Sequence, residues 1–218
     1  MVFFEKIKGL FYYSWFSSKK ELDKELSGDI NTTRFVVLDT ETTGFDTNND
    51  RILCIGAVVL QNNTISIQES FEIYIEQDLY NKATAQIHGI LRNFVLNHPK
   101  ESEALEQFLA FLGDAIIIAH HTKFDITMIN NALERNGFSK LKNKTLDTAI
   151  LYKKTLLISP LLERKEHYTL DDLAEKFDIS VKDRHTALGD AYITAIAFLK
   201  IVEKMRKKKE ISLKELFA

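Results

Sequence analysis

The sequence contains the stretch Arg34-Phe35-Val36-Val37-Leu38-Asp39-Thr40-Glu41 (residues 34–41), in which a continuous apolar run leads into two carboxylates. Such a run predicts a buried strand that ends in an acidic pair. Two more strand-like stretches follow it, Arg51–Leu60 and Thr64–Ile75, and the pair Asn62-Asn63 between them favours a hairpin-like turn. Because the joints are short, we expect these three strands to pair antiparallel.

The pattern changes after residue 100, where helices alternate with short strands. Helices are expected at residues 101–112, 122–136, 169–177 and 186–205, with a short buried strand at 115–119 and a short mixed segment at 146–152. Thr169 and Asp172 have the spacing of a helix start. Three antiparallel strands followed by alternating helices and strands predict an α/β domain with a mixed sheet.

The composition excludes several classes of protein. The 218 residues are 45% hydrophobic and 28% charged, which is typical of a globular domain and excludes a disordered chain. A formal net charge of −2 excludes a strongly basic, histone-like binder, but a nucleic-acid enzyme can obtain its positive field from a local patch or a metal. The single cysteine, Cys54, excludes an intramolecular disulfide. Without a transmembrane-length apolar run or a signal-peptide pattern, the expected compartment is the cytoplasm, and membrane contact is not expected.

The acidic pair at the end of the first strand is the first candidate site. In a strand, alternate residues share a face, so Asp39 and Glu41 point to the same side. Two adjacent carboxylates repel each other unless a cation lies between them, and Mg²⁺ and Mn²⁺ prefer such oxygen ligands. The alternative is an ordinary polar strand end that runs into the turn Thr42-Thr43-Gly44.

Two further acids lie at predicted helix starts. Asp125 follows His120-His121 and the short apolar strand, and Asp190 follows His185 at the start of the long helix. For Asp125 the alternative is a capping box with Thr122, and for Asp190 it is an acid that only compensates the helix dipole. Taken together, the four carboxylates and His185 could converge above one sheet, where two divalent cations would neutralise them and the histidine would accept a proton from an attacking water.

The motifs resemble those of DEDDh-type 3′-to-5′ exonucleases, in particular the proofreading (epsilon) subunits of bacterial DNA polymerase III. The resemblance covers residues 34–203 and rests on five motifs in family order. They are Val37–Gly44, Ile52–Ala57, Ile87–Ile90, His120–Asp125 and His185–Ala191. It implies a ribonuclease H-like fold, with a mixed five-stranded sheet flanked by helices.

The resemblance also implies roles for individual residues. Asp39 would bridge two Mg²⁺ or Mn²⁺ ions, Glu41 and Asp190 would complete one metal site, and Asp125 would serve the other. His185 would be the general base, and a histidine at this position is what assigns the DEDDh branch.

Substrate contacts are implied as well. Thr42 and the nearby backbone would hold the 3′-terminal nucleotide, with His88 close to it; the alternative for His88 is a surface loop histidine. His121 stands where the family usually has asparagine and would alter substrate contacts or the pH response.

The segments outside the family motifs give three predicted units, residues 1–30, 31–205 and 206–218. Residues 1–28 are rich in aromatic residues at helical spacing and predict an extra helical N-terminal segment. This segment could pack on the catalytic domain, dock a partner such as a polymerase or a second copy, or lie on a membrane surface. The tail is basic and partly helical, and Ser212–Phe217 faintly resembles a sliding-clamp-binding peptide.

The expected function is a metal-dependent 3′-to-5′ exonuclease that acts on single-stranded DNA ends and releases nucleoside monophosphates. Three alternatives stay open. They are the same chemistry on RNA, a phosphodiesterase for nucleotide-sized substrates, and a non-catalytic nucleic-acid-binding or scaffold protein on the same fold.

Overall fold

The core of the protein is one mixed sheet. The computed structural model describes residues 28–92, 98–156, 165–207 and 209–218. The strands are β1 (Phe35–Thr42), β2 (Ile52–Gln61), β3 (Thr64–Tyr74), β4 (Ile116–Ala119) and β5 (Thr145–Asp147). They form a five-stranded sheet in the order β3-β2-β1-β4-β5, in which β1, β2 and β3 are antiparallel and β4 and β5 run parallel to β1. The predicted mixed sheet of an α/β domain is therefore confirmed.

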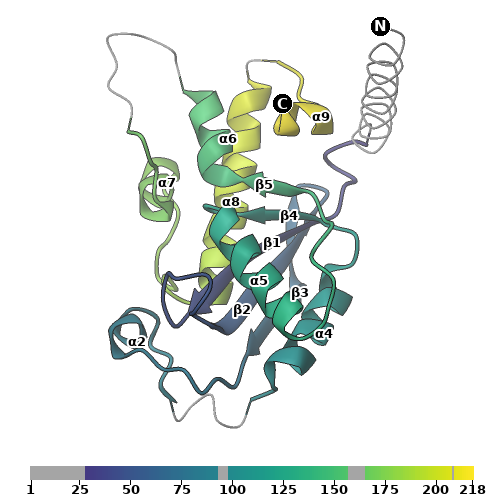
Figure 1. Ribbon diagram of the computed structural model, residues 1–218. Helices are drawn as coiled ribbons and strands as arrows, with labels where there is room; N and C mark the ends of the chain where they lie inside the picture. Colours follow the sequence, from purple (N-terminus) through teal and green to yellow (C-terminus); the bar gives the residue numbers. More distant parts are fainter. Residues whose placement is uncertain (1–27, 93–97, 157–164, 208) are drawn as a thin grey trace, which may run out of the picture.

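Helices cover both faces of this sheet. The helices of the described residues are α2 (Lys82–His88), α4 (Glu101–Leu112), α5 (Lys123–Arg135), α6 (Thr148–Thr155), α7 (Leu170–Phe177), α8 (Ala187–Arg206) and α9 (Leu213–Phe217). Figure 1 shows α5 and α8 on opposite faces of the sheet. Successive residues of β1 alternate between two cores: Phe35 packs 5.5 Å from the ring of Phe198 on the α8 face, whereas Leu38 packs with α4 and α5.

The β2–β3 turn follows the sequence prediction. Asn62 and Asn63 have φ values of 54° and 56°, the left-handed conformation that asparagine tolerates best among residues with a Cβ. Cys54 of β2 lies opposite Glu41 of β1 and is buried. Burial is the main reason that the pKa of its thiol is raised.

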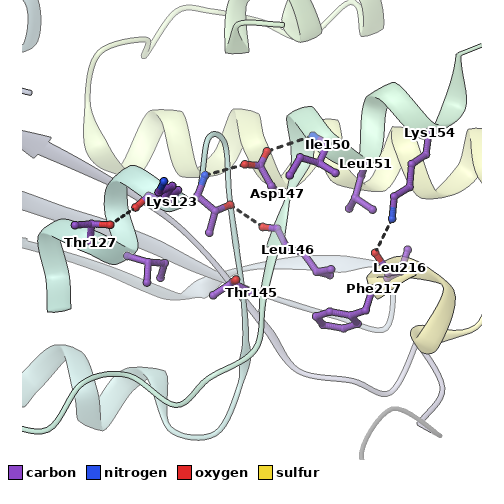
Figure 2. Close-up of a pocket in the computed structure, with 12 residues that line it drawn as sticks. Lys123, Thr127, Thr145, Leu146, Asp147, Ile150, Leu151, Lys154, Leu216 and Phe217 are labelled. Carbon is purple, nitrogen blue, oxygen red and sulfur yellow. Dashed lines mark hydrogen bonds between the residues drawn. The ribbon is translucent and has the colours of Figure 1, made fainter. Parts of the chain in front are cut away.

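In the second half of the chain, side-chain caps fix where two helices, α6 and α7, begin. Asp147 ends β5 and begins α6, because its Oδ1 atom accepts from the backbone N–H of Ala149 (2.8 Å) and of Ile150 (3.3 Å; Figure 2). The mixed segment expected at 146–152 is therefore a strand end joined directly to a helix. At α7, the predicted helix start at Thr169 is confirmed, and Thr169 and Asp172 form a capping box there.

The two flanking units differ in what the structure describes. The predicted helical extension falls outside the described residues except for Gly28 to Ile30, so its three interpretations stay predictions. The tail packs on the domain through Leu213 and Leu216, which are buried in the core beneath α8. A clamp-binding role for the tail stays a prediction. None of the helices in the described ranges combines the length and apolar character needed to cross a bilayer.

Candidate metal centre

Three carboxylates meet at the carboxyl end of β1. Asp39 and Glu41 lie on one face of β1, and Asp190 lies in the first turn of α8. One oxygen from each carboxylate lies within 4.8 Å of the others. Residues 150 positions apart in the chain thus form one acidic cluster, which we call the carboxylate trio.

A glycine lets α8 approach β1 closely enough to form the trio. Gly56 of β2 lies opposite Asp39 in the sheet register. A Cβ atom on Gly56 would lie 2.2 Å from the carbonyl carbon of Ala187 and 2.2 Å from the nitrogen of Leu188. The first turn of α8 therefore rests directly on the backbone of β2, and this contact brings Asp190 to the face that carries Asp39.

Asp125 reaches the same region from α5 but is held differently. Its carboxylate is buried, and Oδ1 accepts from the backbone N–H of Thr40 (3.1 Å) and from the Thr40 hydroxyl (2.7 Å). Thr122 makes no side-chain cap; its hydroxyl donates to the carbonyls of Ala119 and Leu146. The capping-box explanation for Asp125 is therefore wrong, because its carboxylate is turned to β1 rather than to the start of α5.

Burial raises the proton affinity of all four acids, and the charges of neighbouring carboxylates raise that of Asp39 and Glu41 further. Burial raises the pKa of Asp39 well above its usual range, and the charges of Asp125, Asp190 and Glu41 raise it further. Burial, followed by the charge of Asp190, raises the pKa of Glu41 to about 7. Burial raises the pKa of Asp125 to about 7, against the opposing hydrogen bonds from Thr40. Burial likewise raises the pKa of Asp190.

This donor set fits a hard divalent cation. The oxygens come from carboxylates alone, which is the ligand chemistry that Mg²⁺ and Mn²⁺ prefer. The Oδ1 atom of Asp190 is buried and has no hydrogen-bond partner among the described residues, whereas Oδ2 accepts from Arg184. A cation between the carboxylates of the trio would satisfy such an atom and remove the repulsion that raises the pKa values.

Two exposed histidines flank the acids in strained backbone conformations. His185, just before α8, has a φ of 65°, and His121, just before α5, has a φ of 57°. A left-handed φ is uncommon for a residue with a side chain, and such strain is concentrated at functional sites. Next to His121, His120 is held by Thr148 Oγ1 and the Tyr168 carbonyl, both at 2.9 Å. Burial lowers the pKa of His120 to about 4, so His120 is neutral near pH 7.

The two predicted substrate residues of the β1–α2 region are buried. The Thr42 hydroxyl donates to the Gly44 carbonyl at 2.7 Å and so stabilises the turn after β1. His88 ends α2, and its Nδ1 atom accepts from the Ile90 N–H at 3.0 Å. Because His88 is only 9% exposed, the surface-histidine alternative is wrong. Contact of Thr42 and His88 with a nucleotide stays a prediction.

Sequence reasoning missed two side chains near the site. Arg184 contacts Asp190 and partly offsets the rise in the pKa of Asp39 and Glu41; a lone cation beside His185 in an acidic motif was its only signal. Phe45, just after the turn that follows β1, is 80% exposed, and its ring centroid lies 5.9 Å from that of Phe124. Nothing in the pattern around Phe45 indicated exposure.

Asp147 is not part of the carboxylate trio, and its carboxylate bonds to the starts of two helices instead. Besides capping α6, it accepts from the Thr122 N–H through Oδ2 at 3.0 Å. It lines a cavity of about 470 Å³ between α5, α6 and α9, which Figure 2 shows with Lys154 and Leu216 at one side. None of the four acids lines this cavity. Its bonds to three backbone N–H groups give Asp147 a structural role at the start of two helices.

Comparison with known proteins places this geometry in a family. Residues 36–198 match the family model described as Exonuclease. The chain is 32% identical over 171 residues to the DNA polymerase III subunit epsilon of Aquifex aeolicus, covering 78% of this chain and 81% of that protein. It is 33% identical over 174 residues to the PolC-type DNA polymerase III of Caldanaerobacter subterraneus subsp. tengcongensis, covering 79% of this chain but only 12% of that protein.

The fold has a solved counterpart. The structure of E. coli Exonuclease I in complex with a dT13 oligonucleotide superposes with a TM-score of 0.70 at 17% identity, covering 81% of this chain and 42% of that chain. That likeness extends over the mixed sheet and its helices and confirms the predicted ribonuclease H-like fold. Sequence and fold agree, and the chain belongs to the Exonuclease family.

Proposed function

We propose that this protein is a metal-dependent 3′-to-5′ exonuclease that hydrolyses single-stranded DNA and releases nucleoside 5′-monophosphates. The observation that carries the proposal is the carboxylate trio, in which Asp39, Glu41 and Asp190 place oxygens within 4.8 Å of one another. An inert scaffold has no need to maintain such mutual repulsion, whereas phosphodiester hydrolysis uses the cations that it attracts.

The acids would hold two cations, Mg²⁺ or Mn²⁺. Asp39, Glu41 and Asp190 would hold one, and Asp125 with Asp39 would hold the other. When bound, such cations lower the pKa of an attacking water and stabilise charge on the leaving oxygen. Thr40 supports Asp125 through two hydrogen bonds, which oppose the rise in its pKa on burial and direct the carboxylate to β1.

His185 would act as the general base that accepts a proton from the attacking water. Its side chain is exposed just before α8, five residues before Asp190, and in this proposal it accepts a proton from a water held at the trio. The water oxygen forms the new bond to phosphorus while the bond from phosphorus to the 3′ oxygen of the preceding nucleotide breaks. The water proton passes to His185, and the leaving oxygen takes up a proton from solvent to become the new 3′ hydroxyl.

Single-stranded DNA is proposed as the substrate because of what related proteins bind. Exonuclease I has the same fold and was captured with a DNA oligonucleotide, and the two sequence relatives are a DNA polymerase III subunit epsilon and a PolC-type DNA polymerase III. Because this chain spans only an eighth or so of the PolC-type relatives, their partners do not carry over to it. Cytoplasmic location and contact with a polymerase or sliding clamp stay predictions.

The test uses 5′-labelled single-stranded DNA and RNA of one sequence, incubated with the protein and Mg²⁺ or Mn²⁺. A ladder that shortens from the 3′ end supports the proposal, and the faster strand identifies the preferred sugar. A 5′-to-3′ enzyme would instead release the label as a mononucleotide in its first step.

The matched control is Asp39→Asn, which keeps the size of the side chain and removes its charge. We expect this variant to be folded and inactive. If neither strand shortens but a p-nitrophenyl ester of thymidine monophosphate is hydrolysed, the small-substrate alternative is correct. If the wild type cleaves none of the three, the proposed function is wrong.

A further inference from the structure

Arg184 joins two helix starts through one guanidinium group. Its Nη1 atom donates to Oδ2 of Asp190 in the first turn of α8. Its Nε atom donates to Oδ1 of Asp171 in the first turn of α7 at 2.7 Å, and Nη2 lies 3.4 Å from Oδ2 of Asp171. The side chains of Arg184 and Asp190 are 19% and 5% exposed, so their ion pair is shielded from solvent, whereas the Asp171 side chain is 60% exposed.

The loop that carries Arg184 is fixed against α8. The Arg184 N–H donates to the Val181 carbonyl at 3.1 Å, and the Thr186 hydroxyl donates to the Asp183 carbonyl at 2.8 Å. A Cβ atom on Gly189 would lie 2.0 Å from that Asp183 oxygen, so the loop lies directly against the first turn of α8. The backbone of Arg184 therefore cannot move freely relative to Asp190.

Because of this contact, the two oxygens of the Asp190 carboxylate have different environments. Oδ2 accepts from Arg184, while Oδ1 is buried and has no hydrogen-bond partner among the described residues. A carboxylate can rotate about its side-chain torsions, and a bond to one oxygen selects a single orientation. In this orientation Asp190 has an oxygen within 4.8 Å of those of Asp39 and Glu41.

We propose that Arg184 is a positioning residue: it holds Asp190 in the orientation that binds the cation and links this orientation to α7 through Asp171. The inference rests on the proposed function, in which Asp190 is a metal ligand. Charge alone would have the opposite effect, because a guanidinium beside the trio repels a cation. Loss of the guanidinium geometry should therefore weaken cation binding, whereas loss of its charge alone should strengthen it.

The deciding variant is Arg184→Lys, which keeps the charge and loses the planar fork that reaches both carboxylates. Mn²⁺ alone is titrated into the full-length wild type and variant, with binding followed by calorimetry and by the loss of the free Mn²⁺ electron paramagnetic resonance signal. We expect the dissociation constant to rise about 10-fold or more. The Mn²⁺ concentration for half-maximal nuclease activity should rise in parallel.

Two further variants separate positioning from folding. Asp171→Asn leaves Arg184 in place and weakens its outer anchor, so it should weaken Mn²⁺ binding in the same direction by a smaller factor. Arg135→Lys is the matched control, since Arg135 makes an ion pair with Glu101 at 2.8 Å on the other face of the sheet. It should leave Mn²⁺ binding unchanged even if its melting temperature falls.

The outcomes are distinct. Mn²⁺ binding by Arg184→Lys that is within twofold of wild type, or tighter, overturns the positioning role. A melting temperature in EDTA that falls without a change in Mn²⁺ affinity shows a structural role only and overturns it too. Wild-type protein that binds Mn²⁺ but degrades no DNA overturns the proposed function and leaves the positioning result intact.

Discussion

His185 and Asp190 begin the same helix and carry separable parts of the proposed reaction. His185 is exposed and would accept a proton, while Asp190 is buried and would hold a cation. We expect His185→Ala to lower kcat by about 10²–10⁴-fold, the usual contribution of a positioned general base. Mn²⁺ affinity should stay within twofold of wild type.

The matched substitution is His167→Ala, because the His167 side chain is 75% exposed and its nearest charged group is Glu166. Its kcat should equal that of the wild type. A His185→Ala variant with an unchanged rate would show that the proton goes elsewhere.

The raised pKa values of the acids predict how stability depends on pH in the absence of metal. Glu41 and Asp125 have a pKa of about 7 in the folded protein, above their unfolded values, so the folded state binds more protons between roughly pH 4.5 and 7. Stability is therefore greatest below this window and is lost as the pH rises through it. For Glu41, a pKa raised from 4.5 to about 7 corresponds to about 3 kcal/mol.

Thermal unfolding in EDTA at pH 5 and pH 8 measures this effect. The melting temperature should fall between the two, and Mn²⁺ should restore it at pH 8 far more than at pH 5. Glu41→Gln should flatten part of the pH dependence. A metal-free protein equally stable at both values would mean that burial does not raise the pKa of Glu41 and Asp125.

The acids could be predicted from sequence more easily than their partners. Asp39 and Glu41 follow from the period of a strand, because two alternate residues must share a face. Thr40 lies between them and faces the other side of the strand. Nothing in the sequence pattern indicated a role for it, yet its hydroxyl donates to Asp125, which is 85 positions away. Arg184 was missed for the same reason, since a side-chain contact from a loop to two helix starts leaves no periodic pattern.

The approach of α8 to β2 is the contact between elements on which the trio depends. Because a Cβ atom on Gly56 would lie 2.2 Å from the backbone of α8, Gly56→Ala must displace the first turn of that helix. We expect a loss of stability of about 1–3 kcal/mol from overpacking. Since a misplacement of about 1 Å can cost 10²-fold in rate, kcat should fall more than stability suggests.

Gly28→Ala is a suitable control for the added methyl group. A Cβ atom on Gly28 would meet its nearest neighbours at 3.6 and 3.7 Å, which is ordinary van der Waals contact. This variant should match the wild type in rate and in melting temperature. A Gly56→Ala variant with wild-type activity would show that the α8 contact does not set the position of Asp190.

The sequence predicted elements with a strong period better than short ones. The three antiparallel strands and α4, α5 and α8 were predicted to within about two residues, because each carries several periodic apolar positions. The division of residues 146–152 into β5 and α6 was not, since β5 has only three residues and depends on pairing with β4. Short α2 was missed because its only marks are a polar cap and Gly89.

The C-terminal tail covers part of the hydrophobic core of the domain. Leu216 of α9 is 1% exposed and packs in the cluster that includes α6 and α8, and Lys154 of α6 contacts the same turn. Leu216→Ala should lower the free energy of unfolding by about 2–5 kcal/mol. Urea unfolding measures the change, and kcat at 25 °C should be retained because α9 contributes nothing to the trio.

The comparison variant is Ile67→Ala, whose side chain on β3 is 77% exposed. We expect a change within about 0.5 kcal/mol for such a surface position. If Leu216→Ala were equally mild, the tail would be an appendage, as the predicted unit 206–218 implies, rather than part of the fold. Sequence could not decide this point, since a hydrophobic tail reads the same whether it covers its own core or another protein.

The rate at which Cys54 is alkylated can report how often the sheet opens. Cys54 is the only thiol in the chain, and it lies buried on β2 opposite Glu41. An alkylating reagent can reach it only while the strands beneath the carboxylates are apart, so the half-time of iodoacetamide labelling counts those openings. A cation that binds the closed form alone should slow labelling in proportion to its occupancy, which reports metal loading without a substrate or a turnover.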